Sequence, residues 1–298
     1  MATLHVIDGA GGASAHLVVR KIGFADLKDA IARGIDDFMA MPTHVILLSV
    51  IYPIVGLILA RLSFGYDMMP ILFPLAAGFA LIGPFAAIGL YELSRRREEG
   101  LDTSWKHAFE VARSSSADAI LALALMLVVL FVAWLAVAQA LYQSLFGYGT
   151  PDSIGQFLSQ IFTTRQGWTL IIVGNAIGFL FAVVAFAISV ISFPLLIDRD
   201  VGAAVAIQTS VKAVLMNPIV MAAWAMFIVA ALVIGALPFF VGLAVVMPIL
   251  GHASWHLYRK IIAPEDDTPR PTLHHARKGR RYAADFPAVL FPWARDKE

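Results

Sequence analysis

The sequence of 298 residues contains no cysteine and little charge. Without cysteine the chain has no disulfide, no thiolate nucleophile and no cysteine-ligated metal. Charged residues make up only 14% of the chain, whereas soluble domains have about 25%. Apolar residues make up 59%, and the mean hydropathy is +0.78. A chain of this composition requires lipid as its solvent, so we expect an integral membrane protein.

Signatures of common enzymes are also missing. The chain has no glycine-rich phosphate loop ending in Lys-Ser/Thr, no His-Glu-x-x-His and no Gly-x-Ser-x-Gly. We therefore expect a protein that is not an enzyme, with no cofactor and no nucleic-acid partner. Its partners are expected to be the lipid bilayer, anionic lipid headgroups and a membrane protein that the sequence does not identify.

Six apolar stretches account for the composition. Each is close to the roughly 20 residues that a helix needs to cross a bilayer, and they cover residues 45–60, 69–91, 119–141, 169–197, 219–236 and 237–258. The last two are divided at Gly235 and Pro238, because residues 219–258 are too long for one crossing. The sequence therefore predicts an all-α, polytopic membrane protein with six transmembrane helices.

Basic residues avoid every second connection between these stretches. Of the 22 basic residues, only Arg61 and Arg165 lie in the first, third and fifth connections. Lysine and arginine concentrate in the cytoplasmic loops of membrane proteins. This asymmetry predicts that the N-terminus and the C-terminus are both cytoplasmic.

An amphipathic segment precedes each pair of predicted spans. The apolar residues at helical spacing are Leu27, Ile31, Ile35 and Phe38 in the first segment, Trp105, Phe109 and Ala112 in the second, and Ile207, Val211 and Val214 in the third. The segments align without gaps, with Ile31, Trp105 and Ile207 in one position. We predict three cytoplasmic-side amphipathic helices and a weak threefold repeat of helical hairpins.

Two interpretations of these segments remain open. They are either helices that cover the cytoplasmic ends of the bundle or a platform for lipid headgroups or a partner. The second segment favours the platform, because it follows a run of basic residues. The candidate lipid or partner surface is Arg95, Arg96, Arg97, Trp105 and Phe109.

A short list of polar residues remains as candidate sites. His252 and His256 lie four residues apart, so a helix would place both imidazoles on one face, where they suit either a weak metal site or hydrogen bonds at the interface. Asn175 and Gln139 are the clearest polar residues inside the predicted spans. Because ionisable residues are nearly absent there, an ion-coupled transporter is disfavoured, and Asn175 is expected to form an interhelical hydrogen bond.

Three groups of residues resemble a known family. They are Asp26-Leu27 with Gly34-Ile35-Asp36-Asp37-Phe38, Gly89-Leu90-Tyr91-Glu92 with Arg95-Arg96, and the segment from His252 to Arg259. Together they resemble proteobacterial integral membrane proteins classified as domain of unknown function 2189, over residues 20 to 260. The resemblance implies a bacterial inner-membrane location and about six spans, but no established activity.

The predicted organisation is a flexible N-terminus over residues 1–20, a six-helix transmembrane domain over 21–262 and a flexible cytoplasmic tail over 263–298. We expect an assembly, scaffold or envelope protein. The alternatives are a carrier or channel for a small or lipidic solute, and a haem- or metal-binding respiratory accessory that uses His252 and His256.

Overall fold

The computed structural model describes residues 17–41, 73–75, 83–149, 153–238 and 240–264, and its elements over these ranges are helices. The helices are α2 (Phe24–Ala40), α6 (Gly83–Ala86), α7 (Ile88–Glu98), η2 (Trp105–Arg113), α8 (Ala117–Phe146), α9 (Ile154–Thr163), α10 (Arg165–Ser189), α11 (Ser192–Asp198), α12 (Ala203–Met216), α13 (Pro218–Ala236) and α14 (Leu243–Ile261). The all-α prediction is confirmed for this part of the chain.

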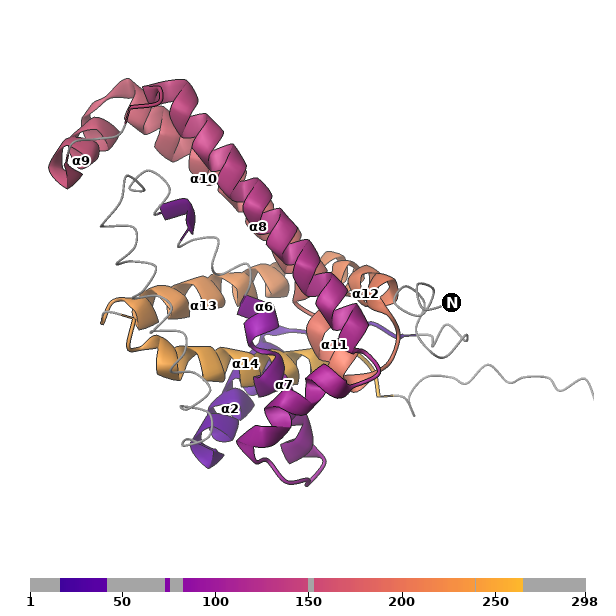
Figure 1. Cartoon of the computed structure of the whole chain (residues 1–298). Coiled ribbons are helices and arrows are strands. Elements are labelled where there is room, and N and C mark those ends of the chain that lie inside the picture. The colour runs from indigo at the N-terminus through magenta and orange to yellow at the C-terminus, as the bar shows by residue number, and fades with distance from the viewer. Residues whose placement is uncertain (1–16, 42–72, 76–82, 150–152, 239, 265–298) are drawn as a thin grey trace, which may run out of the picture. The chain divides into compact units, whose positions relative to one another are not determined.

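Three of these helices are long and apolar enough to cross a membrane. They are Ala117–Phe146, the nearly continuous Arg165–Asp198 and Pro218–Ala236. They match the stretches predicted at 119–141, 169–197 and 219–236. In Figure 1, α8 and α10 run side by side with α9 at their far end, and α13 lies against α14. The three helices therefore form parts of two helical hairpins.

The other three predicted spans have different outcomes. Residues 45–60 and most of 69–91 lie outside the described residues. The stretch 237–258 corresponds to α14, which begins later, at Leu243, because residues 237, 238 and 240–242 form turns after α13. α14 is less apolar than the three helices above, since its second half carries histidine, arginine and lysine, and it is not one of the three. Six spans thus remain a prediction.

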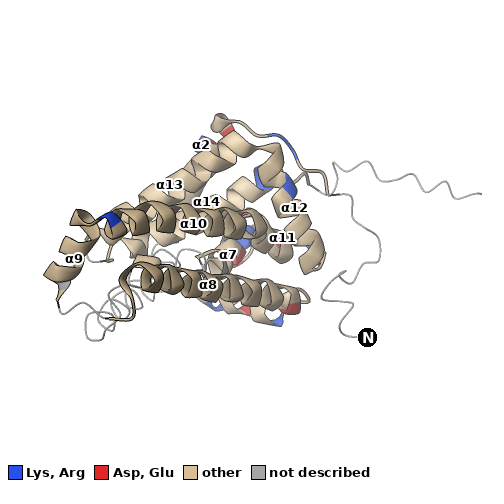
Figure 2. Ribbon diagram, turned by 90° about the horizontal axis from the view of Figure 1, so that it is seen from above, with Lys and Arg blue, Asp and Glu red and all other residues tan. Residues whose placement is uncertain are grey.

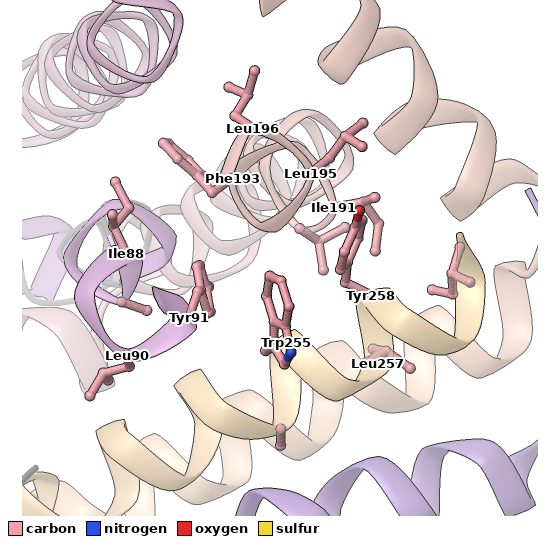
Figure 3. Close-up of a cluster of buried hydrophobic side chains, with 14 of the residues drawn as sticks. Ile88, Leu90, Tyr91, Ile191, Phe193, Leu195, Leu196, Trp255, Leu257 and Tyr258 are labelled. Carbon is pink, nitrogen blue, oxygen red and sulfur yellow. The ribbon is translucent and has the colours of Figure 1, made fainter. Parts of the chain in front are cut away.

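The core of the molecule lies where α7, α11 and α14 meet. Figure 3 shows Tyr91, Trp255 and Tyr258 pointing into the space between these helices, where Ile191 and Phe193 meet them. All five side chains are buried. Aromatic rings of this size contribute most of the apolar area removed from solvent in a cluster. This cluster joins segments that are more than 150 residues apart in the chain.

The first amphipathic segment is helical, but its buried face differs from the prediction. α2 buries Leu27, Ala30, Gly34 and Asp37, whereas Ile35, predicted on the apolar face, is 42% exposed. The reason is close packing against α14. A Cβ atom added to Gly34 would lie 2.6 Å from the backbone nitrogen of Ala253, so the small residues form the contact and the larger ones flank it.

The second segment winds differently from an α-helix. η2 is a 3₁₀ helix, with three residues per turn. Residues three apart therefore share a face: Ala108 and Val111 are buried, whereas Lys106, Phe109 and Ala112 are exposed. The prediction from α-helical spacing placed Trp105, Phe109 and Ala112 on one face, opposite Lys106. That grouping is wrong because the helix type differs, and Lys106 shares the face of Phe109 and Ala112.

The third segment, α12, also makes its contact with small residues. It buries Ala206, Thr209, Ser210 and Ala213, and its predicted apolar residues Ile207, Val211 and Val214 are half-buried. Ser210 Oγ accepts a hydrogen bond from the backbone nitrogen of Ile191, 3.1 Å away, at the junction of α10 and α11. α2 and α12 thus both contact other helices through small side chains.

The two ends of the helical region meet. Val19 and Ile262 form an antiparallel bridge, with hydrogen bonds from Arg20 N to Ile261 O and from Ala263 N to Val18 O. The side chain of Asn217 also accepts from Ile22 N and donates to Arg20 O. The segment before α2 is therefore fixed beside the end of α14.

We predict that Gly34→Ala destabilises the protein by about 1–3 kcal/mol, the usual cost of overpacking. The added methyl group meets backbone atoms of Ala253, which cannot turn aside. Gly155→Ala is the matched control, because nothing lies within 4 Å of its added Cβ. The apparent melting temperature of each purified variant in detergent checks this. Equal melting temperatures for the two variants would contradict the close packing of α2 on α14.

Candidate functional site

A buried carboxylate joins three helices at the charged end of the molecule. Asp37, from α2, is only 3% exposed. Its Oδ2 atom accepts hydrogen bonds from Ser94 Oγ of α7 at 2.6 Å and from His256 Nε2 of α14 at 2.9 Å. Its Oδ1 atom pairs with the Arg97 guanidinium. These contacts satisfy both oxygens, as a buried carboxylate requires.

His252 completes this group, called here the Asp37 cluster: Asp37, Ser94, Arg97, His252 and His256. His252 Nδ1 lies 2.6 Å from Ser94 Oγ. Because Ser94 uses its single proton on Asp37, the serine must accept and His252 must donate. Within this cluster, the negative charge of Asp37 lies beside the positive charge of the Arg97 guanidinium.

The cluster favours the ionised form of Asp37. Burial raises the pKa of this carboxyl, but the hydrogen bonds from His256 and Ser94 and the nearby imidazole charges outweigh burial and hold its pKa below its ordinary value. The charged carboxylate is thus the form that the fold stabilises.

The residue types match a serine hydrolase, but the connections do not. In a catalytic triad the serine donates to the histidine, which donates to the aspartate. Here Ser94 donates directly to Asp37, and its side chain is fully buried. The hydroxyl is therefore used to hold the carboxylate rather than presented to a substrate.

His252 and His256, the predicted metal candidates, both lie in the Asp37 cluster. His256 Nε2 faces Asp37, and His252 Nδ1 faces Ser94. In the described parts of the chain, no three residues among His, Cys, Asp and Glu are arranged to hold a metal ion. His44, which directly precedes the predicted span at 45–60, lies outside the described residues. The imidazoles act here as hydrogen-bond donors.

A second set of polar contacts lies at the same end. Tyr258 Oη donates to Asp198 Oδ2 at 2.5 Å, which joins α14 to the end of α11. Trp255 Nε1 donates to Glu98 Oε2 at 3.0 Å, which joins α14 to the end of α7. Arg259 reaches both Glu98 and Asp198. Figure 2 shows charged residues gathered around α2, α7 and α12, whereas α8, α10 and α13 are mostly uncharged.

The three arginines of the predicted lipid surface form ion pairs within the protein. Arg95 pairs with Glu92 and Glu99 at 2.8 and 3.0 Å. Arg96 contacts Glu92 at 3.5 Å and Glu110 at 3.4 Å. Arg97 pairs with Asp37. Their charge is directed to carboxylates of α2, α7 and η2, so the arginines join these helices.

Trp105 and Phe109, the aromatic part of the predicted surface, face outward. Trp105 is 37% exposed and Phe109 is 61% exposed. The two rings meet edge to face, with centroids 6.0 Å apart. The two aromatic residues therefore lie together on an exposed surface, whereas the three arginines form ion pairs with carboxylates of the protein.

A cavity of about 190 Å³ lies beneath this region, between α7, η2 and α11. Its charged lining consists of Glu92, Arg95, Arg96 and Glu110, and these residues already pair with one another. The cavity therefore has little excess charge to attract an ion.

Asn175 and Gln139, the predicted intramembrane polar residues, do not join the Asp37 cluster. Asn175 is exposed, and its Nδ2 donates to Ile171 O of the same helix at 2.7 Å. Among the described residues, this side chain forms no hydrogen bond with another helix, so the expected interhelical bond is not found there. Gln139 is half-buried on α8.

The sequence analysis missed three residues of this region: Asp37, Ser94 and Asn217. Asp37 was named only as part of the family resemblance, because the larger apolar residues were assumed to form the buried face of this helix. The usable signal was the series Leu27, Ala30 and Gly34, whose spacing continues to Asp37 on the same helix face. Ser94 and Asn217 carry no comparable pattern.

Comparison with known proteins agrees with the predicted family. A family model described as predicted integral membrane protein, domain of unknown function 2189, matches residues 72–198. The resemblance is thereby confirmed over a shorter range than the predicted 20 to 260. No curated protein and no solved structure matches the chain.

We predict that Asp37→Ala lowers the free energy of unfolding by about 2–4 kcal/mol, because it leaves Ser94 and His256 buried without their hydrogen-bond partner and removes the ion pair with the exposed Arg97. Asp36→Ala is the matched control: Asp36 is exposed, and surface changes usually stay within about 0.5 kcal/mol. Detergent melting curves measure both effects.

The same pair of variants gives a pH test. The pKa of Asp37 is lowered by folding, so its contribution is present above the unfolded value of about 3.9 and is lost as the pH falls below it. The difference between wild type and Asp37→Ala should shrink below about pH 4. A constant difference down to lower pH would contradict an ionised Asp37.

Proposed function

We propose that this protein, whose residues 72–198 match a family of predicted integral membrane proteins, is a six-span bacterial inner-membrane protein with both termini in the cytoplasm. We further propose that it is not an enzyme and acts in assembly, scaffolding or envelope maintenance. The observation that carries the proposal is the joining of α2, α7, α11 and α14 at one charged end of the molecule.

The polar contacts limit the number of crossings, because two residues in contact lie on the same side of a membrane. Asp198 and Tyr258 are hydrogen-bonded, and α13 makes one crossing between them. The chain must therefore return before Tyr258, and α14 is the described helix that follows α13. This supports α14 as a span despite its lower hydropathy.

The same reasoning applies to the other contacts. Arg97 pairs with Asp37, so the chain crosses an even number of times between them, which agrees with the two spans predicted at 45–60 and 69–91. Glu98 and Asp198 both contact Arg259, and α8 and α10 supply the two crossings between them. Six spans in total agree with the bridge between Val19 and Ile262.

The orientation rests on the charges of the shared end. Basic residues from four helices or their flanking segments lie there, including Arg33, Arg97, Arg199 and Arg259. Among the described residues outside this end, Arg165 begins α10, next to α9. The positive-inside rule therefore supports a cytoplasmic location for the joined end.

The contacts also support the threefold repeat. The register that aligns Ile31, Trp105 and Ile207 also aligns Gly34, Ala108 and Ser210. Each of these residues contacts another helical segment. Ala108 lies against Gly89 and Ser210 against Ile191, which both belong to the preceding predicted span, whereas Gly34 lies against Ala253 of α14. The first two of these pairs are both separated by 19 residues. The chain thus contains three similar junctions, and the first of them joins the first described helix, α2, to the last, α14.

The proposed absence of catalysis is supported by how the polar groups are used. The residue types suited to acid–base or nucleophilic chemistry, Ser94, Asp37 and the two histidines, bond to one another in the core. Such groups contribute to helix docking. A scaffold needs a stable cytoplasmic end, whereas an enzyme needs these groups open to a substrate.

We predict the outcome of thiol labelling, which is clean because the chain has no native cysteine. Ser144→Cys, near the end of α8, and Ser159→Cys, on α9, should react with a membrane-impermeant reagent in intact cells whose outer membrane is permeabilised. Ser114→Cys, between η2 and α8, should react only after lysis. All three positions are exposed. Labelling of Ser114→Cys in intact cells would overturn the orientation.

We predict that Asn175→Ala and Gln139→Leu both restore the phenotype of a strain lacking the gene, at wild-type abundance in the membrane. A carrier needs polar groups along its route, and Asn175 instead bonds to its own helix. A scaffold does not depend on either side chain. Loss of complementation by both variants, with normal folding, would replace the scaffold with the carrier.

A further inference from the structure

The outward face of η2 is an apolar surface that no described residue covers. Phe109 is 61% exposed, and Trp105 supports it through an edge-to-face contact. Because a 3₁₀ helix has three residues per turn, Lys106 and Ala112 share the face of Phe109. The face therefore combines an aromatic pair with a basic side chain.

The position of η2 along the chain fixes its distance from the bilayer. η2 ends at Arg113, and α8 begins four residues later, at Ala117. α8 has 30 residues, so its length is about 45 Å, close to the full thickness of a bilayer including the headgroups. The start of α8 and the adjoining η2 therefore lie at the level of the headgroups.

The charge available at this face is positive. Lys106 and Arg113 are both exposed and form no ion pair within the described ranges. The acidic residue of η2, Glu110, already pairs with Arg96 and His107. Since Arg95, Arg96 and Arg97 pair with carboxylates, Lys106 and Arg113 are the groups left to contact an anion.

The helix at the opposite end of α8 provides a comparison. η2 precedes α8, whereas α9 follows it. α9 exposes Leu158 and Phe162, and Trp168 lies beside them. Residues 154–163 contain no charged side chain. Both segments thus present aromatic and aliphatic groups at headgroup level, but only η2 adds positive charge.

We propose that the η2 face, defined as the outward row Lys106, Phe109 and Ala112 together with the exposed flanking residues Trp105 and Arg113, binds the anionic headgroups of the inner leaflet. The aromatic rings insert among the headgroups, as they do in membrane-interface belts, and the two basic side chains contact the lipid phosphates. Each basic residue near an anionic surface strengthens binding several-fold, so two should favour anionic lipid on the order of tenfold. This inference rests on the cytoplasmic orientation proposed above.

The test uses the full chain reconstituted in vesicles. Ala112→Cys is labelled with an environment-sensitive fluorophore, which reports the η2 face without removing either ring. In phosphatidylcholine vesicles that contain phosphatidylglycerol, the emission should move to shorter wavelength and be quenched by brominated acyl chains. Without phosphatidylglycerol, or in high salt, both effects should decrease, because salt screens exposed charges.

Matched variants distinguish lipid binding by the η2 face from a general attraction between basic residues and anionic lipid. Replacing Lys106 and Arg113 with Gln should remove the dependence on phosphatidylglycerol. Replacing Lys28 and Lys212, exposed residues of α2 and α12, with Gln should leave it unchanged. The same fluorophore at Ser159→Cys on α9 should show no such dependence.

Several results would overturn the proposal. They are equal emission with and without phosphatidylglycerol, quenching by aqueous iodide in place of brominated lipid, or the same lipid dependence at Ser159→Cys. The orientation is checked separately by labelling Ser144→Cys and Ser114→Cys. A correct orientation with no lipid effect would reject only the lipid surface, whereas an inverted orientation would reject the proposed function.

Discussion

The carboxylate of Asp37 is the group on which the joined end of the molecule depends. It is buried, ionised and bonded to side chains of two other helices, α7 and α14. Burying a carboxylate costs free energy unless its oxygens accept hydrogen bonds. Once Asp37 is buried, each of its partners is therefore needed to offset that cost. The contact also determines where α2 lies, because only one position brings Asp37 to both Ser94 and His256.

Small residues make this arrangement possible. Gly34 lies against Ala253, and this close approach brings Asp37, on the next turn of α2, within hydrogen-bonding distance of His256 on α14. At the aligned positions of the other two junctions, Asp37 is replaced by Val111 and Ala213, which are also buried. Apolar residues therefore suffice to pack such a junction. We interpret the polar residues as a source of specificity, since a buried ion pair is a weak source of stability but restricts the choice of partner.

The features that depend on hydropathy averaged over many residues could be predicted from the sequence. The features that depend on individual side-chain contacts could not. Three spans, the helical segments before them and the family resemblance followed from hydropathy and short motifs, because a membrane imposes a strong length requirement on apolar helices. The buried face of α2 could not be read from apolar spacing, since the approach of α14 selects small residues over large ones. The histidines were noticed for their spacing, but their partner Asp37 is 219 residues away from His256. The winding of η2 was missed because α-helical periodicity was assumed.

The separation between α2 and α14 has a consequence for biosynthesis. α2 leaves the ribosome before α14, and the histidine of α14 that binds Asp37 is made about 220 residues later. At about 5–20 residues per second, the interval is on the order of 10–45 s. During that time Asp37 and the small residues of α2 lack their partners on α14. Completion of α14 is therefore required before this contact can form, and a chain halted before residue 250 would leave Asp37 without His256.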